Sequence, residues 1–216
     1  MIDPSVFKYF NSEIGIRRYG GHYDFEIEKI ECDLLLEIGV GSRFSVKSNG
    51  YMVGIDIAKE LLRQGRIISS FGSLICADAC FLPFRKNIFQ RVYSKFLLHH
   101  LIGRTPKTTQ NNIKLVLKEL ARVLKTRGNI FIDEWCVHSS LETMILFYIT
   151  KMLDHWGVGL NIIYLEPHVV IYFLTINKLK HLLEIAKLKG NCRIINSWKW
   201  HKFPVLLWMK SCATLI

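Results

Sequence analysis

Short apolar runs alternate with helical patterns between Cys32 and Glu134, and this alternation constrains the fold more than any other feature of the chain. Helical patterns cover residues 58–66 and 110–124, and the second has apolar side chains every three or four positions. The apolar runs have the length of buried strands, and they cover residues 33–38, 51–55, 73–77, 91–94 and 129–134. Strands and helices that alternate at this spacing form parallel βαβ units. We therefore predict an α/β fold with a doubly wound, mostly parallel sheet.

The end of the chain follows a different pattern. We expect a helix over residues 176–188, followed by strands over 193–198 and 203–210 with a turn near His201. A connection as short as this one forces the two strands to pair antiparallel, at the edge of the sheet. Residues 135–174 are rich in aromatic and aliphatic side chains and predict a helical insertion that covers the carboxyl edge of the sheet.

The charge of the chain is unevenly distributed. Its 216 residues, the size of one domain, hold 29 basic and 18 acidic side chains, for a net charge of +11. Residues 177–216 contribute +7 of this charge, from eight basic residues and one acidic residue. Such a basic segment suits a nucleic acid, an acidic lipid surface or a phosphorylated substrate, and a solvated basic face is an equal alternative.

Other features concern the location of the protein. The best apolar stretch, residues 160–176, is interrupted by Glu166, Pro167 and His168, so we expect no transmembrane segment. The first residues lack the pattern of a secretory signal, and the six cysteines include no CxxC pair. We therefore expect a cytoplasmic protein with reduced thiols. Cys136 and His138 have no second matching pair, and no metal site is predicted.

Acidic residues stand at the ends of three consecutive predicted strands. Glu37 opens the glycine turn Glu37-Ile-Gly-Val-Gly41, Asp56 follows 19 residues later, and Asp78 another 22 residues later. Ligands of open α/β sheets bind at the carboxyl ends of the strands. Glycines let a ligand approach the backbone, and we expect a helix after the turn to offer unpaired N–H groups. Each acid alone fits a helix cap or a surface position, whereas the three together predict a binding rim.

The glycine turn also restricts the ligand. The carboxylate of Glu37 would repel the pyrophosphate of a dinucleotide but attract the ammonium of an amino acid, and Asp56 can accept the hydroxyls of a ribose. An ammonium, a ribose and an adenine occur together in S-adenosylmethionine. A nicotinamide-dependent dehydrogenase stays open as an alternative, because Arg43 could meet a phosphate.

The segment from Leu34 to Glu134 resembles the class I S-adenosylmethionine-dependent methyltransferases, in particular the broad methyltransferase-domain group. The similar motifs are Glu37-Ile-Gly-Val-Gly41, Gly54-Ile-Asp-Ile57, Ala77-Asp-Ala-Cys-Phe-Leu-Pro-Phe84, Val92-Tyr-Ser-Lys-Phe-Leu-Leu-His-His-Leu101 and Leu117-Lys-Glu-Leu-Ala-Arg-Val-Leu-Lys-Thr-Arg-Gly128. The resemblance implies a seven-stranded sheet with an antiparallel last hairpin and a helical insertion after strand five. It also implies one methyltransferase domain over 1–216, with an amino-terminal cap segment (1–32), a cofactor-binding core (33–134), a substrate-side insertion (135–174) and a final helix with an edge hairpin (175–216).

The resemblance implies S-adenosyl-L-methionine as the cofactor and S-adenosyl-L-homocysteine as its product. The methionine moiety would be bordered by Glu37, Gly39 and Gly41 and flanked by Ser94.

The nucleoside half of the cofactor would meet residues of the next two strand ends. Asp56 would accept the ribose hydroxyls with Ile57 beside the adenine, and Asp78 and Ala79 would meet the adenine edge.

The reaction itself is less constrained by the sequence. His99 follows the fourth strand and is the candidate general base, with packing on the sheet as its alternative role. The aromatic insertion favours a small organic or lipid-like methyl acceptor. The basic tail favours RNA, and the Leu-Pro-Phe and His-His segments are also similar to those of tRNA wobble-uridine methyltransferases. Arg43 and Gln90 depart from the family pattern, which leaves a non-catalytic partner subunit as a further alternative.

Overall fold

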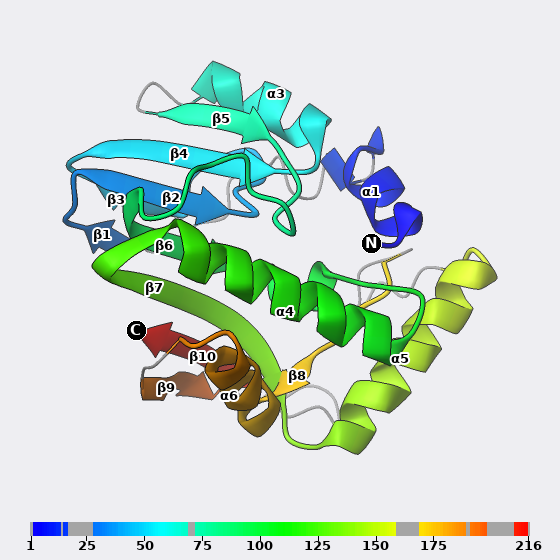
Figure 1. Ribbon diagram of the computed structural model, residues 1–216. Coiled ribbons are helices and arrows are strands. Elements are labelled where there is room, and N and C mark those ends of the chain that lie inside the picture. The colour runs from blue at the N-terminus through cyan, green and yellow to red at the C-terminus, as the bar shows by residue number, and fades with distance from the viewer. Residues whose placement is uncertain are drawn as a thin grey trace.

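The computed structural model describes residues 2–13, 15, 16, 28–68, 72–158, 169–188, 191–197 and 210–215. In this part of the chain an eight-stranded sheet has the order β5-β4-β2-β6-β7-β10-β9, and β8 pairs with β7 beside this path (Figure 1). The strands are β2 (Leu34–Ile38), β4 (Tyr51–Asp56), β5 (Ser73–Cys76), β6 (Phe89–Lys95), β7 (Leu124–Val137), β8 (Leu174–Thr175), β9 (Asn191–Ser197) and β10 (Lys210–Leu215).

Strands β5, β4, β2, β6 and β7 pair in parallel, and β10 pairs antiparallel with both β7 and β9. The chain runs outward from β2 through β4 to β5 and then returns to the other side of β2 to form β6 and β7. The strand order therefore reverses beside β2, which is the point where ligands of such sheets bind. The predicted α/β class with a doubly wound, mostly parallel sheet is confirmed.

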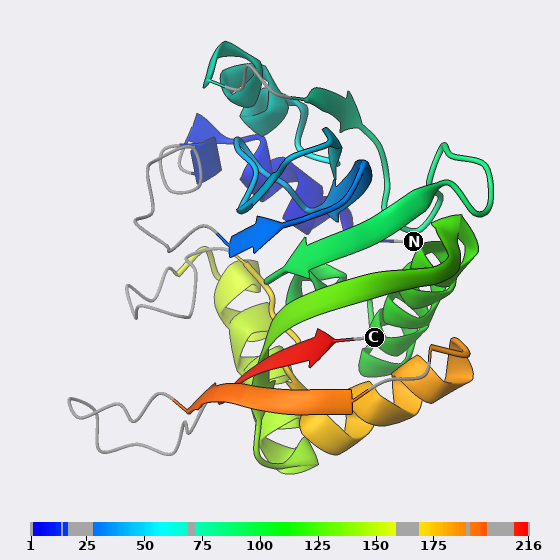
Figure 2. The ribbon, with the colours of Figure 1, turned by 90° about the vertical axis from the view of Figure 1, so that its left-hand side faces the viewer.

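Two helices cover one face of the sheet. Helices α4 (Pro106–Val123) and α6 (Ile176–Ile185) lie side by side on this face (Figures 1 and 2). Helix α4 begins at a Thr105 cap, whose hydroxyl accepts a hydrogen bond from the N–H of Thr108, as helix N-termini require. Its apolar stripe is completely buried against the sheet, and the stripe consists of Ile113, Val116, Leu117 and Leu120. Burial of such side chains contributes about 1.5–3 kcal/mol each, so this layer anchors the sheet.

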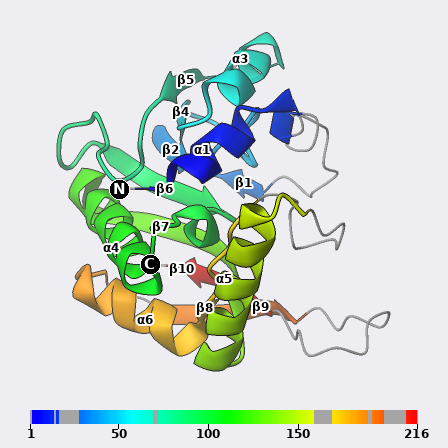
Figure 3. The same ribbon diagram turned by 90° about the vertical axis from the view of Figure 1, so that its right-hand side faces the viewer.

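Other helices lie at the ends and edge of the sheet. Helix α3 (Lys59–Ile68) packs beside β5, whereas α1 (Pro4–Phe10) and α5 (Ser140–His155) lie on the side to which the arrowheads of β2 and β4 point (Figures 1 and 3). The short 3-10 helix η1 (Leu98–His100) follows β6. No helix among the described residues combines the length and apolar character needed to cross a membrane.

The connection after β2 differs from the prediction. The expected helix after the glycine turn is absent, and residues 42–45 form a loop that leads into strand β3 (Val46–Ser48). Strand β3 pairs in parallel with β1 (Glu28–Ile30) in a separate two-stranded sheet. The expectation of a helix is wrong because only 12 residues separate Ile38 from Tyr51, and the last of them already form β3 and its turn.

Other boundaries also move. Strand β7 extends through Val137, so the first residues of the predicted insertion over 135–174 belong to the sheet. The two-residue strand β8 brings the sheet to eight strands where seven were expected. The predicted strand over 203–210 and the turn near His201 lie almost entirely outside the described residues, and the described strand β10 starts at Lys210.

Candidate cofactor site

Four neighbouring strands bring most of the predicted site residues to one edge of the sheet. In spatial order, Asp78 follows β5, Asp56 ends β4, Glu37 and the glycine turn end β2, and Ser94 lies near the end of β6. The register pairs Asp56 with Cys76 and Ile38 with Ser94, so these positions lie at similar heights along the strands. Their order matches the order in which the methionine, ribose and adenine parts of the predicted ligand follow one another.

The glycine turn leaves space on one side of its backbone. Gly39 and Gly41 have φ angles of +69° and +59°, in the left-handed region that glycine adopts without strain. A Cβ atom at Gly39 would lie 2.9 Å from Cδ1 of Leu97, whereas a Cβ at Gly41 would have no heavy atom within 4 Å. A ligand can therefore reach the backbone at Gly41, while Gly39 is required by the packing of Leu97.

Asp56 ties the glycine turn to the next strand. Its Oδ2 accepts a hydrogen bond from the N–H of Gly41 at 2.9 Å, and its Oδ1 accepts one from the N–H of Ala58 at 2.8 Å. Burial raises the pKa of Asp56, and these N–H groups oppose the shift. Since each carboxylate oxygen can accept a second hydrogen bond, the held carboxylate still has capacity for two ribose hydroxyls.

Glu37 lies beneath the turn, with its carboxylate directed at the loop that replaces the expected helix. The side chain is buried, and its two oxygens accept hydrogen bonds from the N–H of Ser45 at 3.0 and 3.1 Å and from the Ser45 hydroxyl. Burial raises the pKa of Glu37 to about 7, although the Ser45 hydrogen bonds and the nearby charge of Lys95 act in the opposite direction. The carboxylate thus holds the loop in place, and its contact with a ligand ammonium stays a prediction.

Asp78 and Ala79 begin the loop at the adenine end of the predicted site. The Oδ1 atom of Asp78 accepts a hydrogen bond from the N–H of Cys80 at 2.8 Å, and Ala79 is buried. The exposed thiol of Cys76, at the end of β5, donates a hydrogen bond to the carbonyl of Ile57 at 3.7 Å. This contact joins the end of β5 to the residue that follows β4. Asp78, Ala79 and Ile57 therefore border the same end of the rim.

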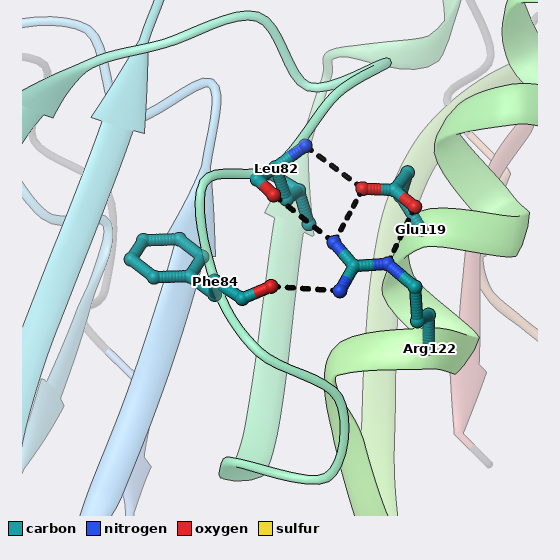
Figure 4. A network of polar contacts seen from close by, with 4 residues as sticks. All are labelled: Leu82, Phe84, Glu119 and Arg122. Carbon is teal, nitrogen blue, oxygen red and sulfur yellow. Dashed lines mark hydrogen bonds and ion pairs between the residues drawn. The ribbon is translucent and has the colours of Figure 1, made fainter.

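A network around Arg122 fixes the course of this loop (Figure 4). The guanidinium of Arg122, on α4, donates hydrogen bonds to the carbonyls of Leu82 at 3.0 Å and Phe84 at 2.7 Å. Glu119, one turn earlier, pairs with Arg122 at 2.6 Å and accepts a hydrogen bond from the N–H of Leu82 at 2.8 Å. These hydrogen bonds lower the pKa of Glu119. Two motifs that lie far apart in the sequence thus serve one purpose, which is to hold the loop after Asp78.

Ser94 carries a buried hydroxyl that makes no hydrogen bond to the described part of the chain. The residue is 1% exposed, and its Oγ has no partner among the described residues. An unsatisfied buried polar group costs about 1–3 kcal/mol, which a ligand atom could recover. The open space at Gly41 and the unpartnered hydroxyl of Ser94 therefore both fit a polar ligand that lies across β2 and β6.

His99 lies on η1 and pairs with an acid that was not among the predicted site residues. Its Nδ1 lies 2.6 Å from Oε1 of Glu134, which is buried near the end of β7. Glu134 is separated from His99 by 35 residues, so sequence spacing does not link the two. Glu134 could have been predicted as a site residue from its place at the end of the fifth predicted strand, because the three acids of the rim also stand at strand ends.

Comparison with known proteins shows which proteins this arrangement resembles. Residues 36–132 match a family model described as a methyltransferase domain. A solved S-adenosylmethionine-dependent methyltransferase from Methanosarcina mazei has the same fold, with a TM-score of 0.58 and 15% identity over 94% of this chain and 98% of that one. The fold and the matched segment, 97 of the 216 residues, are similar to those of the class I S-adenosylmethionine-dependent methyltransferases. The cofactor of that class is S-adenosylmethionine, and its product is S-adenosyl-L-homocysteine.

Two curated relatives share the same region. A tRNA (carboxymethyluridine(34)-5-O)-methyltransferase from Arabidopsis thaliana is 30% identical over 122 residues, which are 55% of this chain and 28% of the relative. A demethylmenaquinone methyltransferase from Corynebacterium urealyticum is 31% identical over 103 residues, which are 48% of this chain and 40% of the relative. The chain therefore spans less than half the length of either relative.

Proposed function

We propose that the protein transfers a methyl group from S-adenosylmethionine to a small organic or lipid-like acceptor by direct displacement. The observation that carries this proposal is the rim itself, where Asp56, the open backbone at Gly41 and the unpartnered Ser94 hydroxyl lie on adjacent strands. When bound, the cofactor supplies a methyl group on a positively charged sulfur, which an acceptor atom can take directly.

Each residue of the rim has a defined part in holding this ligand. The carboxylate of Asp56 accepts hydrogen bonds from the ribose hydroxyls, and the hydroxyl of Ser94 forms a hydrogen bond with the methionine part of the cofactor. Glu37 supplies negative charge behind the glycine turn, which favours a bound ammonium because charges interact strongly where water is excluded. Asp78, Ala79 and Ile57 border the adenine. The main contribution to rate is then the positioning of two reactants, which needs no covalent bond to the protein.

The acceptor class is inferred from the side chains beyond the rim. An apolar cluster joins α1 to the segment before β8, and it contains Tyr9, Val137, Leu146, Val169, Ile171 and Phe173 with Phe10 and Trp135 packed against it. Pockets for small organic ligands are lined mainly by such apolar and aromatic side chains. This apolar cluster favours an apolar acceptor over a highly charged one.

RNA is the second candidate acceptor. The net charge of +11 and the basic residues of the last forty positions favour a polyanion, and the plant relative is named for its action on tRNA. Methylation of RNA would weaken steeply with added salt, because binding to phosphates releases counterions.

Transfer of labelled methyl groups to cell extract would separate these candidates. Extract would be incubated with the protein and methyl-labelled S-adenosylmethionine, then fractionated into RNA, lipid and small molecules. We expect label in the lipid or small-molecule fraction. Label only in RNA, lost as salt is raised, would replace the proposed acceptor with RNA. Binding of the cofactor without label in any fraction would identify a non-catalytic subunit.

A further inference from the structure

We propose that Glu134 is a positioning residue that holds the imidazole of His99 with its proton on Nδ1, so that Nε2 accepts a proton from the methyl acceptor. This inference rests on the proposed methyl transfer and adds to it the chemical class of the acceptor atom. The observation behind it is the contact between two buried polar side chains, His99 on η1 and Glu134 near the end of β7. Neither side chain belongs to the cofactor rim.

The hydrogen bonds around Glu134 determine which atom carries the proton. Its Oε2 accepts a hydrogen bond from the N–H of Leu98 at 2.5 Å, and its Oε1 accepts one from the N–H of Trp135 at 2.8 Å. Backbone N–H groups can only donate, so both oxygens of the carboxylate are set as acceptors. The third neighbour, Nδ1 of His99 at 2.6 Å, is then a donor too. Neutral histidine carries one ring proton, and its place on Nδ1 leaves Nε2 as an acceptor.

The imidazole is fixed in orientation by its other neighbours. Its ring centroid lies 4.0 Å from that of His100 and 5.0 Å from that of Phe173. The carbonyl of His99 accepts a hydrogen bond from the N–H of Tyr172 at 3.1 Å, which ties η1 to the segment before β8. The side chain retains 9% exposure, and no hydrogen bond joins its Nε2 to any described residue. One ring nitrogen of a rigidly held imidazole is thus left for a ligand.

The pair lies next to the methionine end of the proposed cofactor site. Leu97, two residues before His99, packs against Gly39 of the glycine turn. Ser94, with its unpartnered hydroxyl, lies on the strand that leads into η1. The apolar cluster proposed to meet the acceptor includes Phe173, whose ring contacts that of His99. His99 therefore lies between the two parts of the site that the reaction must bring together.

This placement defines the acceptor as a compound with an O–H or N–H group. As the acceptor oxygen or nitrogen would form its bond to the methyl carbon, the bond between that carbon and the cofactor's sulfur would break, with its electron pair left on the sulfur. The acceptor's proton would pass to Nε2 of His99. The carboxylate of Glu134 offsets the positive charge that appears on the imidazole, and the proton then leaves to solvent. A positioned general base of this kind contributes about 10²–10⁴-fold to a rate. An acceptor without a removable proton, such as a thioether, would gain nothing from this pair.

Nitrogen NMR of the 15N-histidine-labelled protein tests the inference directly. Long-range couplings show which ring nitrogen is protonated, and the His99→Asn variant assigns the signal. We expect His99 to be protonated on Nδ1 in the neutral state, and Glu134→Gln, whose amide can donate, to move the proton to Nε2. Protonation on Nε2 in the unaltered protein would overturn the inference whether or not any variant folds.

Cofactor binding and methyl transfer complete the test. We expect His99→Asn and Glu134→Gln to lower the rate of label transfer about 100-fold or more, with the affinity for S-adenosylmethionine unchanged within about twofold. An unaltered protein that fails to bind S-adenosylmethionine would refute the proposed function instead. Cofactor binding with no transfer by the unaltered protein would likewise refute the proposed function. Normal label transfer by Glu134→Gln, with transfer by the unaltered protein intact, would overturn the role of Glu134 alone.

Discussion

At the scale of single residues, the carboxylates of the rim are already engaged by the protein before any ligand binds. The two oxygens of Asp56 accept hydrogen bonds from the backbone N–H groups of Gly41 and Ala58. Both oxygens of Glu37 accept hydrogen bonds from Ser45. These bonds fix the carboxylates in place, so ligand binding need not order them. The residues that bind the cofactor in our account are therefore also the residues that shape the glycine turn and the loop after it.

The raised pKa of Glu37 makes a prediction about stability. Its folded pKa of about 7 lies above the ordinary value of 4.5, so between these values the folded state keeps a proton that the unfolded state has lost. The free energy of unfolding should therefore fall as pH rises from 4.5 to 7, by about 3 kcal/mol from this group alone. Urea unfolding at several pH values measures this fall. In the Glu37→Gln variant the fall should shrink by that amount, and equal pH profiles for the two proteins would contradict the prediction.

The open space at Gly41 predicts a substitution that affects binding more than folding. Gly41→Ala places a methyl group where nothing lies within 4 Å, at a φ of +59° that costs an L-residue about 1–2 kcal/mol. We expect urea unfolding to show a loss of this size and calorimetry to show at least tenfold weaker binding of S-adenosylmethionine. Asp33→Ala, just before the opposite end of β2, is the control because the one hydrogen bond of its carboxylate within the described residues comes from the side chain of Gln90. If Gly41→Ala binds S-adenosylmethionine with unchanged affinity, the cofactor does not contact the backbone at Gly41.

At the scale of secondary structure, the sequence was sufficient for the five parallel strands and for helix α4. The apolar residues that make up these runs and stripes are buried in the structure, and this is why their pattern predicted the elements. The segment between Ile38 and Tyr51 has no such period, so the helix expected after the glycine turn rested on the general βαβ pattern, and the chain forms a loop and β3 there instead. The partnership of His99 and Glu134 was invisible for another reason, because it joins side chains from two strand ends that only the sheet brings together.

The Arg122 network makes a prediction for the loop after β5. Arg122→Ala removes the hydrogen bonds to the carbonyls of Leu82 and Phe84 and the pairing with Glu119. We expect a loss of about 1–3 kcal/mol in the free energy of unfolding, because the carbonyls lose a charged donor. Amide exchange at Leu82 should also become faster, as its acceptor Glu119 is no longer held. The exposed Lys118→Ala on the same helix should change stability by no more than about 0.5 kcal/mol. Equal stability of the two variants would show that the network does not hold the loop.

At the scale of the whole molecule, the residues of the proposed site lie at one end of the sheet. The carboxyl ends of the parallel strands hold the rim and the His99–Glu134 pair, and helices α1 and α5 lie at the same end (Figure 3). The apolar layer under α4 and α6 contributes mainly stability, and of the predicted site residues this cluster includes Ala79. Sequence reasoning predicted the cofactor half of this end from its acids and glycines. The half that we propose to bind the acceptor lacks such a pattern, since its apolar side chains have the pattern of ordinary core residues.

The measurement that tests the central claim most directly is calorimetric titration with S-adenosylmethionine at pH 6.5, in two buffers of different ionisation enthalpy. We predict binding by the unaltered protein with release of a proton, because a bound ammonium favours the ionised form of Glu37, whose pKa is about 7 in the free protein. Glu37→Gln should abolish this release, and Asp56→Ala should weaken binding at least tenfold. If the double variant Glu37→Gln/Asp56→Ala binds S-adenosylmethionine as tightly as the unaltered protein, the rim is not the cofactor site.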